Sequence, residues 1–350
     1  MSTPNRGLWI LQDGSVEVRT ITSSREPDEG EARIKVLYSG INPADTKHVA
    51  YGICDTVIGY DFCGVVDKAG PGFPFGVGEV IAGSTPSGVG RPDKYGTHQN
   101  FITYPANEYA FKVPAHLPPE HAACLKVAVR SAADGLFVHL GLPLPGEQQS
   151  VPAGGLLVWG GTTSMGICAI QLAKAIGVHP VIVTASPKNH ETLVQLGATA
   201  CFDYKDDNVK AVIENYVSEQ GTTIAWAFET VGSSDPPTAD LAAACVGPLA
   251  KVVAARAHPN YPSVYAAKET SATIRTPAGG EITVPSKPEE AQRGQKALLW
   301  AIENYGTKFR IPNVHVLEDK KSSSEVIEIL KAVAKGKAGF GKFVLKHPIA

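Results

Sequence analysis

One stretch of the sequence indicates the fold most directly: Leu157-Val158-Trp159-Gly160-Gly161-Thr162-Thr163-Ser164-Met165-Gly166. Its apolar start predicts a buried strand, and apolar residues at helical spacing then predict a helix from Gly166 to Gly177. A loop between a strand and a helix start presents free amides and the positive end of the helix dipole to an anion. The stretch therefore favours a pyrophosphate-binding turn, with an ordinary strand-to-helix turn as the alternative.

The sequence around this loop alternates strands and helices. Strands are predicted at Pro180–Thr184, Ala225–Glu229 and Leu249–Ala254, and a helix at Asn189–Leu196. Such alternation implies a parallel sheet with right-handed crossovers. Residues 124–290 are therefore predicted to form a Rossmann domain, a doubly wound parallel sheet.

The remaining residues have the texture of a small β-barrel. Short β-rich runs such as Ala32–Tyr38 and Cys63–Lys68 alternate with Gly-Pro, Asn-Pro and Pro-Gly turn signals. Small antiparallel barrels show this pattern. The chain returns to a closing strand at Gly341–Lys346, so we assign residues 1–123 and 291–350 to one antiparallel β-barrel domain. The predicted fold class is α/β.

Composition and charge exclude several classes of protein. The 350 residues include 35 Gly and 26 Pro, well below the roughly 25–30% combined share of low-complexity chains. The formal charge of −2 leaves no electrostatic footprint for nucleic acid or an anionic membrane. The start lacks a signal-peptide core, and no apolar run reaches the about 18 residues of a spanning helix. We expect a soluble, cytoplasmic protein.

The six cysteines are scattered, with no Cys-x-x-Cys pair. This spacing is typical of free thiols in a reducing compartment and offers no structural zinc cluster. No metal is predicted.

The end of the second predicted strand of the Rossmann domain bears on the cofactor. NAD enzymes typically carry an acidic residue about 20 residues beyond the loop, where it holds the ribose 2′-hydroxyl. Here Ser186 and Lys188 stand in that region. A hydroxyl and a cation suit a 2′-phosphate, so NADPH is the predicted cofactor. A surface Ser and Lys at a helix start are the alternative.

The chain as a whole resembles the medium-chain dehydrogenase/reductase superfamily. The motifs that carry the resemblance are Gly40–Lys47, Gly59–Val66, Val113–Pro118, the Ala122-Ala123 pair, Gln171–Lys174, Leu196–Ala198 and Phe202–Tyr204. The resemblance implies a GroES-like catalytic barrel beside the Rossmann domain. Zinc-dependent members carry a Cys near position 42 and a Gly-His-Glu where this chain has Gly59-Tyr60-Asp61. The chain is therefore similar to the zinc-free quinone-oxidoreductase and enoyl-reductase branch.

Two segments, Val158–Ser164 and Ser186–Asn189, look most like those of fungal stand-alone enoyl reductases. Those enzymes act in trans on polyketide synthases whose own reductase domain is inactive. The resemblance thus implies a polyketide synthase as partner and a monomer, whereas quinone-type relatives often form homodimers through an edge strand. Both oligomeric states stay open.

The resemblance also implies the positions that bind cofactor and substrate. The cofactor positions are Gly160, Thr162, Thr163, Ser164 and Met165 along the phosphates and nicotinamide, Ser186, Pro187, Lys188 and Asn189 at the 2′-phosphate, Tyr204 at the adenosine, Leu249, Phe343 and Val344 at the nicotinamide, and Asp45, Thr46 and Lys47 from the barrel side. The candidate substrate positions are Arg130 and Ser131, which stand where the family usually has a Thr-Ala pair.

The implied reaction is hydride transfer from NADPH to the β-carbon of an α,β-unsaturated thioester. Negative charge develops on the thioester oxygen and a proton must reach the α-carbon, so positioned donors lower the barrier. Lys47, Ser131 and Tyr60 are the motif-borne donors, and Lys47 is our candidate catalytic residue, with a cofactor-contacting or surface lysine as the alternative. The rival functions are a quinone or small-enone reductase and a cofactor-binding partner protein without turnover.

Overall fold

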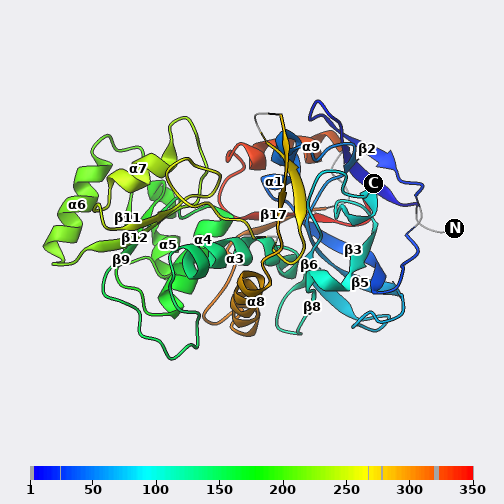
Figure 1. The fold of residues 1–350 in the computed structure, drawn as a ribbon, viewed down its shortest axis with the longest axis horizontal. Coiled ribbons are helices and arrows are strands. Elements are labelled where there is room, and N and C mark those ends of the chain that lie inside the picture. Colours follow the sequence, from blue (N-terminus) through cyan, green and yellow to red (C-terminus); the bar gives the residue numbers. More distant parts are fainter. Residues whose placement is uncertain (1–3, 24, 267, 277–278, 319–322, 350) are drawn as a thin grey trace. The chain divides into compact units, whose positions relative to one another are not determined.

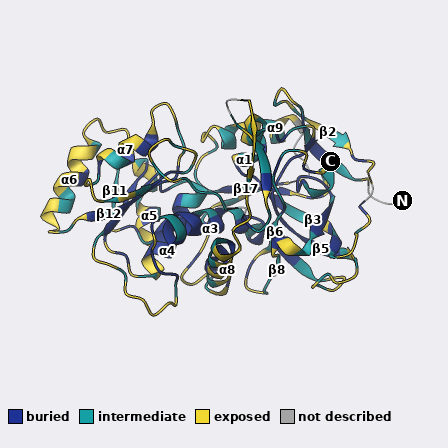
Figure 2. Cartoon of the chain, viewed as in Figure 1, coloured by how far each residue is buried: buried dark blue, intermediate teal, exposed yellow. Residues whose placement is uncertain are grey.

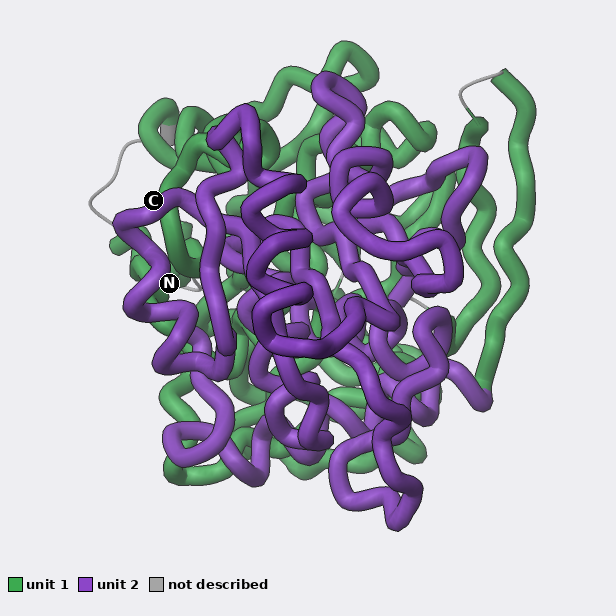
Figure 3. Tube along the Cα trace, turned by 90° about the vertical axis from the view of Figure 1, so that its left-hand side faces the viewer, with its two compact units in different colours: residues 1–127, 267–288, 312–350 green, residues 128–266, 289–311 purple. Residues whose placement is uncertain are grey.

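A computed structural model describes residues 4–23, 25–266, 268–276, 279–318 and 323–349. The chain divides into two compact units, coloured separately in Figure 3. Unit 1 comprises residues 1–127, 267–288 and 312–350, and unit 2 comprises residues 128–266 and 289–311.

Unit 1 is built mainly from β-strands, with β3 (Glu31–Gly40) at its centre. On one side β3 pairs with β5 (Asp61–Ala69), and its two ends also pair with β7 (Phe101–Pro105) and β17 (Lys342–Lys346). The strand order is β16-β17-β3-β5-β6-β8, with β7 beside β3. These pairs are antiparallel, but β16 (Val314–Leu317) runs parallel to β17, which differs from the predicted all-antiparallel barrel.

Shorter elements complete unit 1. The strands are β1 (Arg6–Ile10), β2 (Val16–Thr20), β4 (Thr56–Val57), β6 (Val80–Ser84), β8 (Phe111–Lys112), β14 (Ala272–Arg275) and β15 (Glu281–Val284). The helices are α1 (Ala44–Lys47), α2 (Pro119–Ala122) and α9 (Ser323–Ala334), with 3-10 turns at His48–Tyr51, Asp93–Tyr95 and Ala106–Glu108.

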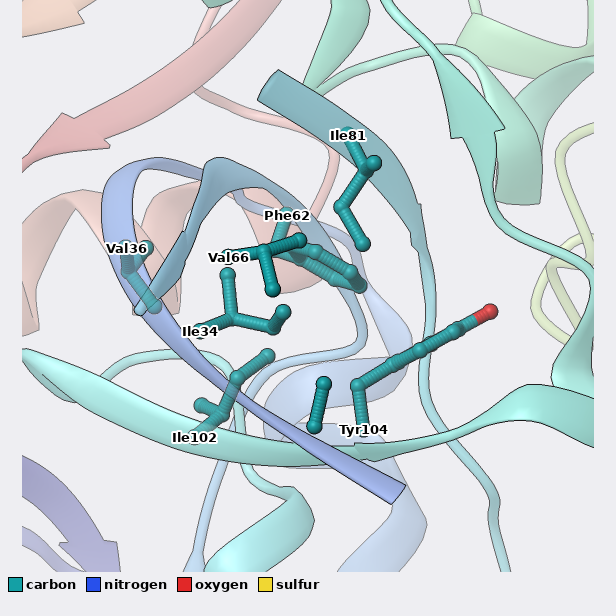
Figure 4. Packing of buried hydrophobic residues seen from close by; sticks show 8 residues of the cluster. Ile34, Val36, Phe62, Val66, Ile81, Ile102 and Tyr104 are labelled. Carbon is teal, nitrogen blue, oxygen red and sulfur yellow. The ribbon is translucent and has the colours of Figure 1, made fainter. Parts of the chain in front are cut away.

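Apolar side chains from alternate positions of these strands form the core of unit 1. Figure 4 shows Ile34 and Val36 of β3 facing Phe62 and Val66 of β5. The rings of Phe62 and Tyr104 lie 5.0 Å apart between centroids. Alternation of buried and outward residues is the pattern that a strand with one buried face requires.

Unit 2 contains a parallel sheet with the strand order β11-β10-β9-β12-β13. Figure 1 labels its strands β9, β11 and β12. The strands are β9 (Gly155–Trp159), β10 (Val181–Thr184), β11 (Ala200–Phe202), β12 (Ile224–Glu229) and β13 (Lys251–Val253). From β9 the chain winds first toward β11 and then in the other direction through β12. The predicted doubly wound sheet is therefore confirmed, and β9 lies at the point where the winding reverses.

Helices connect and cover these strands. They are α3 (Lys126–Ala133), α4 (Ser164–Ala175), α5 (His190–Leu196), α6 (Val209–Glu219), α7 (Thr238–Ala244) and α8 (Pro288–Glu303), with a π-helical turn at Asp134–His139 and a 3-10 turn at Pro187–Asn189. Figure 2 shows α4 mostly buried and α6 mostly exposed. The apolar sequence of α4 accounts for its burial.

The compact units differ from the predicted domains in the return segment. The prediction places 267–290 with the Rossmann domain, but the structure places 267–288 in unit 1. The β14–β15 hairpin in this segment bonds to unit 1, because the amide of Val89 donates to the carbonyl of Thr273 at 2.7 Å. In addition, the hydroxyl of Thr270 donates to Glu108 at 3.0 Å.

The prediction also places residues 291–311 with the barrel, whereas the structure places 289–311 in unit 2. Helix α8 explains this difference, since Arg130 of α3 donates to the carbonyl of Ala291 at 3.2 Å. A Cβ at Gly294 would lie 3.1 Å from Nε of Arg130, which shows how closely α8 packs on that side chain.

Among the residues that the structure describes, every helix is too short or too polar to span a lipid bilayer. The six cysteines are free thiols.

Candidate cofactor-binding and active site

The glycine loop after β9 is shaped by three positions that exclude a side chain. Gly160 has a φ of +96°, and a Cβ there would lie 2.4 Å from Val231. A Cβ on Gly161 would lie 2.2 Å from Val183, and one on Gly166 would lie 2.4 Å from the carbonyl oxygen of Gly160. The loop therefore packs closely against its neighbours at these three positions, where a side chain would not fit.

Thr163 closes the loop as the N-cap of α4. Its Oγ1 accepts a hydrogen bond from the amide of Gly166 at 2.9 Å and donates to Oγ1 of Thr230 at 2.9 Å. Thr230 in turn donates to the carbonyl of Gly160 at 2.8 Å. The Thr163 hydroxyl proton is thus used inside the protein.

The first-turn amides of α4 remain as anion donors. A helix has no internal acceptor for its first amides, so those of Ser164 and Met165 point out of its N-terminus. Thr162, Ser164 and Met165 are half-buried along the loop. The backbone of the loop therefore fits a dinucleotide pyrophosphate. Gly160 permits a close approach of the ligand, and the N-terminus of the 12-residue helix α4 follows the loop.

The structure brings the predicted 2′-phosphate and adenosine positions together at the carboxyl ends of two neighbouring strands, β10 and β11. Thr184 of β10 and Phe202 of β11 are register partners. Two residues beyond them come Ser186 and Tyr204, so both follow the carboxyl ends of adjacent parallel strands. Ser186 is half-buried, and Tyr204 is 45% exposed.

The 3-10 turn Pro187–Asn189 continues from Ser186 along the same edge. Pro187 and Lys188 are exposed and Asn189 is half-buried. Within unit 2, these residues and the glycine loop therefore follow neighbouring strands, β10 and β9, at their carboxyl ends.

Leu249 does not join this group. Leu249 precedes β13, which runs parallel to β12. It therefore lies at the amino ends of the parallel strands, whereas the glycine loop lies at their carboxyl ends. A turn closed by the Ala250 amide and the Gly247 carbonyl at 3.0 Å leaves its side chain 97% exposed. The structure places Leu249 away from the glycine loop, and its contact with the nicotinamide stays a prediction.

The sequence reasoning did not select two threonines that support the loop. Thr184 accepts from the amide of Gly160 at 3.0 Å, and Thr230 bonds to the carbonyls of Trp159 and Gly160. Each lies at or just past the carboxyl end of a strand next to β9. Counting forward to the ends of the predicted neighbouring strands would have found both.

In unit 1, helix α1 presents the predicted residues Asp45, Thr46 and Lys47 in different environments. Asp45 is buried, and its Oδ2 accepts from the Asn42 amide at 2.7 Å and lies 3.1 Å from Nε2 of His98. Thr46 is half-buried and Lys47 is exposed. Asp45 therefore anchors the helix, while Thr46 and Lys47 lie nearer the surface of the unit.

The loop before α1 is fixed by a buried lysine of β17. Nζ of Lys342 donates to Oδ1 of Asn42 at 2.7 Å and to the Ile41 carbonyl at 3.0 Å. Nδ2 of Asn42 donates to Asp61 at 2.9 Å. Burial raises the pKa of Asp61 to about 6, although the charge of Lys342 opposes that rise.

Two more predicted residues, Phe343 and Val344, lie in β17 next to the loop that precedes α1. The carbonyl of Phe343 accepts from the amide of Ile41 at 2.8 Å, and Val344 is the register partner of Gly40. The Phe343 ring is stacked on His315 at 4.7 Å. Val344 lies in a strand paired on both sides and is fully buried, so its side chain has no exposed surface to offer a cofactor.

Arg130 and Ser131 lie on α3 within unit 2. The Arg130 side chain is 4% exposed and donates to the carbonyl of Ala291, so α8 holds it. This contact differs from the predicted role of binding substrate and explains why a large cation is accommodated there. Ser131 is half-buried.

In the described part of the chain, no group of three or more His, Cys, Asp or Glu side chains is placed to hold a metal ion. The chemistry of these sites is that of backbone amides, hydroxyls and lysines.

Comparisons with known proteins identify the family. Residues 28–115 match the alcohol dehydrogenase GroES-like domain, and residues 164–268 match the zinc-binding dehydrogenase domain. A zinc-type alcohol dehydrogenase-like protein of Schizosaccharomyces pombe is 31% identical over 67% of this chain and 67% of its own length. The chain belongs to the medium-chain dehydrogenase/reductase superfamily.

Within the superfamily, the chain resembles fungal trans-enoyl reductases. The trans-enoyl reductase tazE of Aspergillus terreus is 34% identical over 62% of this chain and 74% of its own length. The trans-enoyl reductase resD of Aspergillus sclerotiorum is 30% identical over 58% of this chain and 60% of its own length. The predicted resemblance is thereby confirmed.

Solved structures show the same fold over the whole chain. The CurK enoyl reductase superposes with a TM-score of 0.73 at 17% identity, covering 99% of this chain and 100% of that one. The mycobacterial protein Rv1454c in complex with NADPH gives a TM-score of 0.67 at 19% identity, covering 98% and 100%. The predicted combination of a GroES-like domain and a Rossmann domain is confirmed.

Proposed function

We propose that this chain is an NADPH-dependent enoyl reductase that acts in trans on the α,β-unsaturated thioester of a carrier-bound polyketide intermediate. Its relatives among the trans-enoyl reductases support the reaction class and a polyketide synthase as the partner. One observation in the structure carries the cofactor assignment. Ser186 and Lys188, a hydroxyl and a cation, follow the carboxyl end of β10, which pairs with β9, the strand that leads into the glycine loop.

The residues proposed to hold the dinucleotide come from the sequence motifs of the family. The proposed contacts are Gly160, Thr162, Thr163, Ser164 and Met165 through the loop backbone, Ser186, Pro187, Lys188 and Asn189 at the 2′-phosphate, Tyr204 at the adenosine, and Thr46, Lys47 and Phe343 from unit 1. Bound NADPH would supply the hydride that adds to the β-carbon of the substrate.

Lys47 is proposed to donate to the thioester oxygen, where negative charge develops during the reaction. Lys47 is the last residue of α1 and is exposed, and a positioned donor stabilises the developing enolate. The backbone contacts of the loop would hold the reactants in register. Such positioning is able to lower a barrier by about 7–11 kcal/mol.

The cofactor assignment is tested by replacing Ser186 and Lys188 with Ala and measuring dissociation constants by fluorescence. A hydrogen bond to a charged group contributes about 1.5–3 kcal/mol, so we expect the Kd for NADPH to rise at least about tenfold. The Kd for NADH should stay within about twofold, because NADH lacks the phosphate.

Lys210→Ala is the matched control, since Lys210 is an exposed cation of α6 that pairs with Glu214. Its affinity for NADPH should equal that of the wild type. Equal losses for NADPH and NADH in the double variant would overturn the 2′-phosphate assignment.

The reaction is tested by following NADPH consumption with three acceptors: an enoyl thioester on a phosphopantetheinylated carrier protein, the same acyl group on N-acetylcysteamine, and a soluble benzoquinone. We expect the carrier-bound thioester to be reduced with the highest kcat/KM. Rapid turnover of the quinone alone would identify a quinone reductase. Binding of NADPH with no reduction of any acceptor would identify a partner protein without turnover.

We also propose a monomer. Beyond the end of β13, the segment 262–264 bonds to Ala254, whose amide donates to the Pro262 carbonyl at 2.9 Å. A proline-bearing segment bonded at the end of the edge strand disfavours strand pairing between copies. Sedimentation at micromolar concentration would show a dimer if this proposal is wrong.

A further inference from the structure

Tyr60 carries a phenol that is bonded to the end of helix α1. It lies directly before β5, and its hydroxyl is 2.6 Å from Nδ1 of His48 and 3.4 Å from Oγ of Ser87. His48 is the residue after Lys47, the proposed donor to the thioester oxygen. The phenol is therefore tied to the segment of unit 1 that is proposed to meet the reactants.

The ring of Tyr60 is buried, but its hydroxyl is directed toward partly exposed groups. The residue is 6% exposed, whereas His48 and Ser87 are both half-buried. The guanidinium carbon of Arg91 lies 4.7 Å from the ring centroid, and Nη1 of Arg91 donates to the Gly59 carbonyl at 3.1 Å. The ring is thus held in place while its hydroxyl lies between two side chains that reach the surface of unit 1.

The electrostatic setting keeps both members of the pair neutral near pH 7. Burial lowers the pKa of His48 to about 4 and raises the pKa of Tyr60 above its ordinary value. Two charges face the pair: Arg91 favours a phenolate, and Asp45 disfavours it. Arg91 therefore faces the phenolate that forms when the phenol gives up its proton, and the neighbouring imidazole is placed to return a proton to it.

We propose that Tyr60 is the acid that protonates the α-carbon of the substrate, with His48 as the positioning residue that reprotonates it. This inference rests on the proposed enoyl reduction. It separates two roles: Lys47 donates to the thioester oxygen, and Tyr60 completes the new C–H bond.

Hydride addition at the β-carbon leaves an electron pair shared between the α-carbon and the thioester oxygen. That pair forms the α-carbon C–H bond with the Tyr60 hydroxyl proton, and the O–H bonding pair remains on the phenolate. The Nδ1 proton of His48 then passes to the phenolate while Nε2 takes a proton from solvent. The imidazole ends neutral in its other tautomer, and one solvent proton is consumed.

The test uses the N-acetylcysteamine thioester of (E)-2-methyl-2-butenoic acid with NADPH, because protonation at its α-carbon creates a stereocentre. The wild type should yield one configuration. Tyr60→Phe should lower kcat at least about 100-fold, since a general acid contributes about 10²–10⁴-fold. Its residual product should contain both configurations, because solvent then protonates either face.

His48→Gln keeps a hydrogen-bonding group beside the phenol but cannot pass on a proton. It should lower kcat while the product keeps one configuration. Tyr38→Phe, which removes a phenol hydroxyl from strand β3, is the matched control and should match the wild type in rate and product. Kd for NADPH and the melting temperature of every variant show that the fold and cofactor site are intact.

The outcomes separate the two proposals. If Tyr60→Phe keeps the wild-type kcat and a single product configuration, the role of Tyr60 is overturned while enoyl reduction stands. If Lys47→Ala loses the configuration and Tyr60→Phe does not, the α-carbon acid is Lys47. If the wild type reduces no enoyl thioester, the proposed function fails and this inference fails with it.

Discussion

At the scale of the residue, Gly160 sets the close approach on which the cofactor site depends. Its φ of +96° and the 2.4 Å from an added Cβ to Val231 both oppose any side chain. We predict that Gly160→Ala weakens NADPH binding at least about tenfold and lowers the free energy of unfolding, since left-handed backbone alone costs roughly 1–2 kcal/mol for a residue with a Cβ. Fluorescence titration and urea denaturation measure the two effects.

Gly177 provides the control for this prediction. It has a similar φ of +85° at the end of α4, but an added Cβ would meet nothing within 4 Å. Gly177→Ala should therefore show the backbone cost alone, with an unchanged Kd for NADPH. If both variants lose affinity equally, the steric role of Gly160 is not supported.

Individual side chains show where prediction from sequence reaches its limit. Ser186, Lys188 and Tyr204 follow predicted strand ends, and the structure brings them to one sheet edge because parallel strands share a direction. The burial of Val344 and the exposure of Leu249 depend on which strand ends pair and where β13 begins. A local pattern of apolar residues does not contain that information.

At the scale of the element, α4 depends on Thr163 as its N-cap. The Oγ1 of Thr163 accepts from the Gly166 amide at 2.9 Å, so we predict that Thr163→Val destabilises the protein by about 0.5–2 kcal/mol. The free first-turn amides should also lose their alignment, which weakens NADPH binding. Thr163→Ser keeps the oxygen and should restore both quantities in urea denaturation and fluorescence titration. A serine variant as unstable as the valine variant would show that the capping oxygen does not account for the effect.

Most elements follow from local periodicity, and their assignment to units does not. Strands β9, β10 and β12 and helix α4 lie within one or two residues of their predicted positions, because buried strands and capped helices have local signals. The predicted domains and the compact units differ in where they place the hairpin β14–β15 and helix α8. Their places depend on long-range contacts, such as Thr270 with Glu108 and Arg130 with Ala291.

At the scale of the whole molecule, distant parts of the chain meet in a buried polar chain inside unit 1. His98 Nδ1 lies 2.9 Å from Oγ of Ser39, which lies 2.8 Å from Nε2 of His347. Nδ1 of His347 is 3.3 Å from Oδ1 of Asn100, which also accepts from the amide of Ile349 at 2.7 Å. The C-terminal segment is thus joined to β3 through buried histidines, an arrangement that the net charge of −2 does not reveal.

This buried histidine makes the stability of the protein sensitive to acid. Burial, with the nearby His98, lowers the pKa of His347 from 6.5 to about 3. Between these values the unfolded chain binds a proton that the folded chain does not, so the free energy of unfolding falls as the pH drops from about 6.5 to about 3, by at most ~1.4 kcal/mol per pH unit for this group. Urea denaturation at pH 7, 6, 5 and 4 measures the slope. His347→Gln should make the slope shallower by up to that amount. His116→Gln, at an exposed position, should leave the slope unchanged. Equal slopes in all three proteins would contradict the assignment.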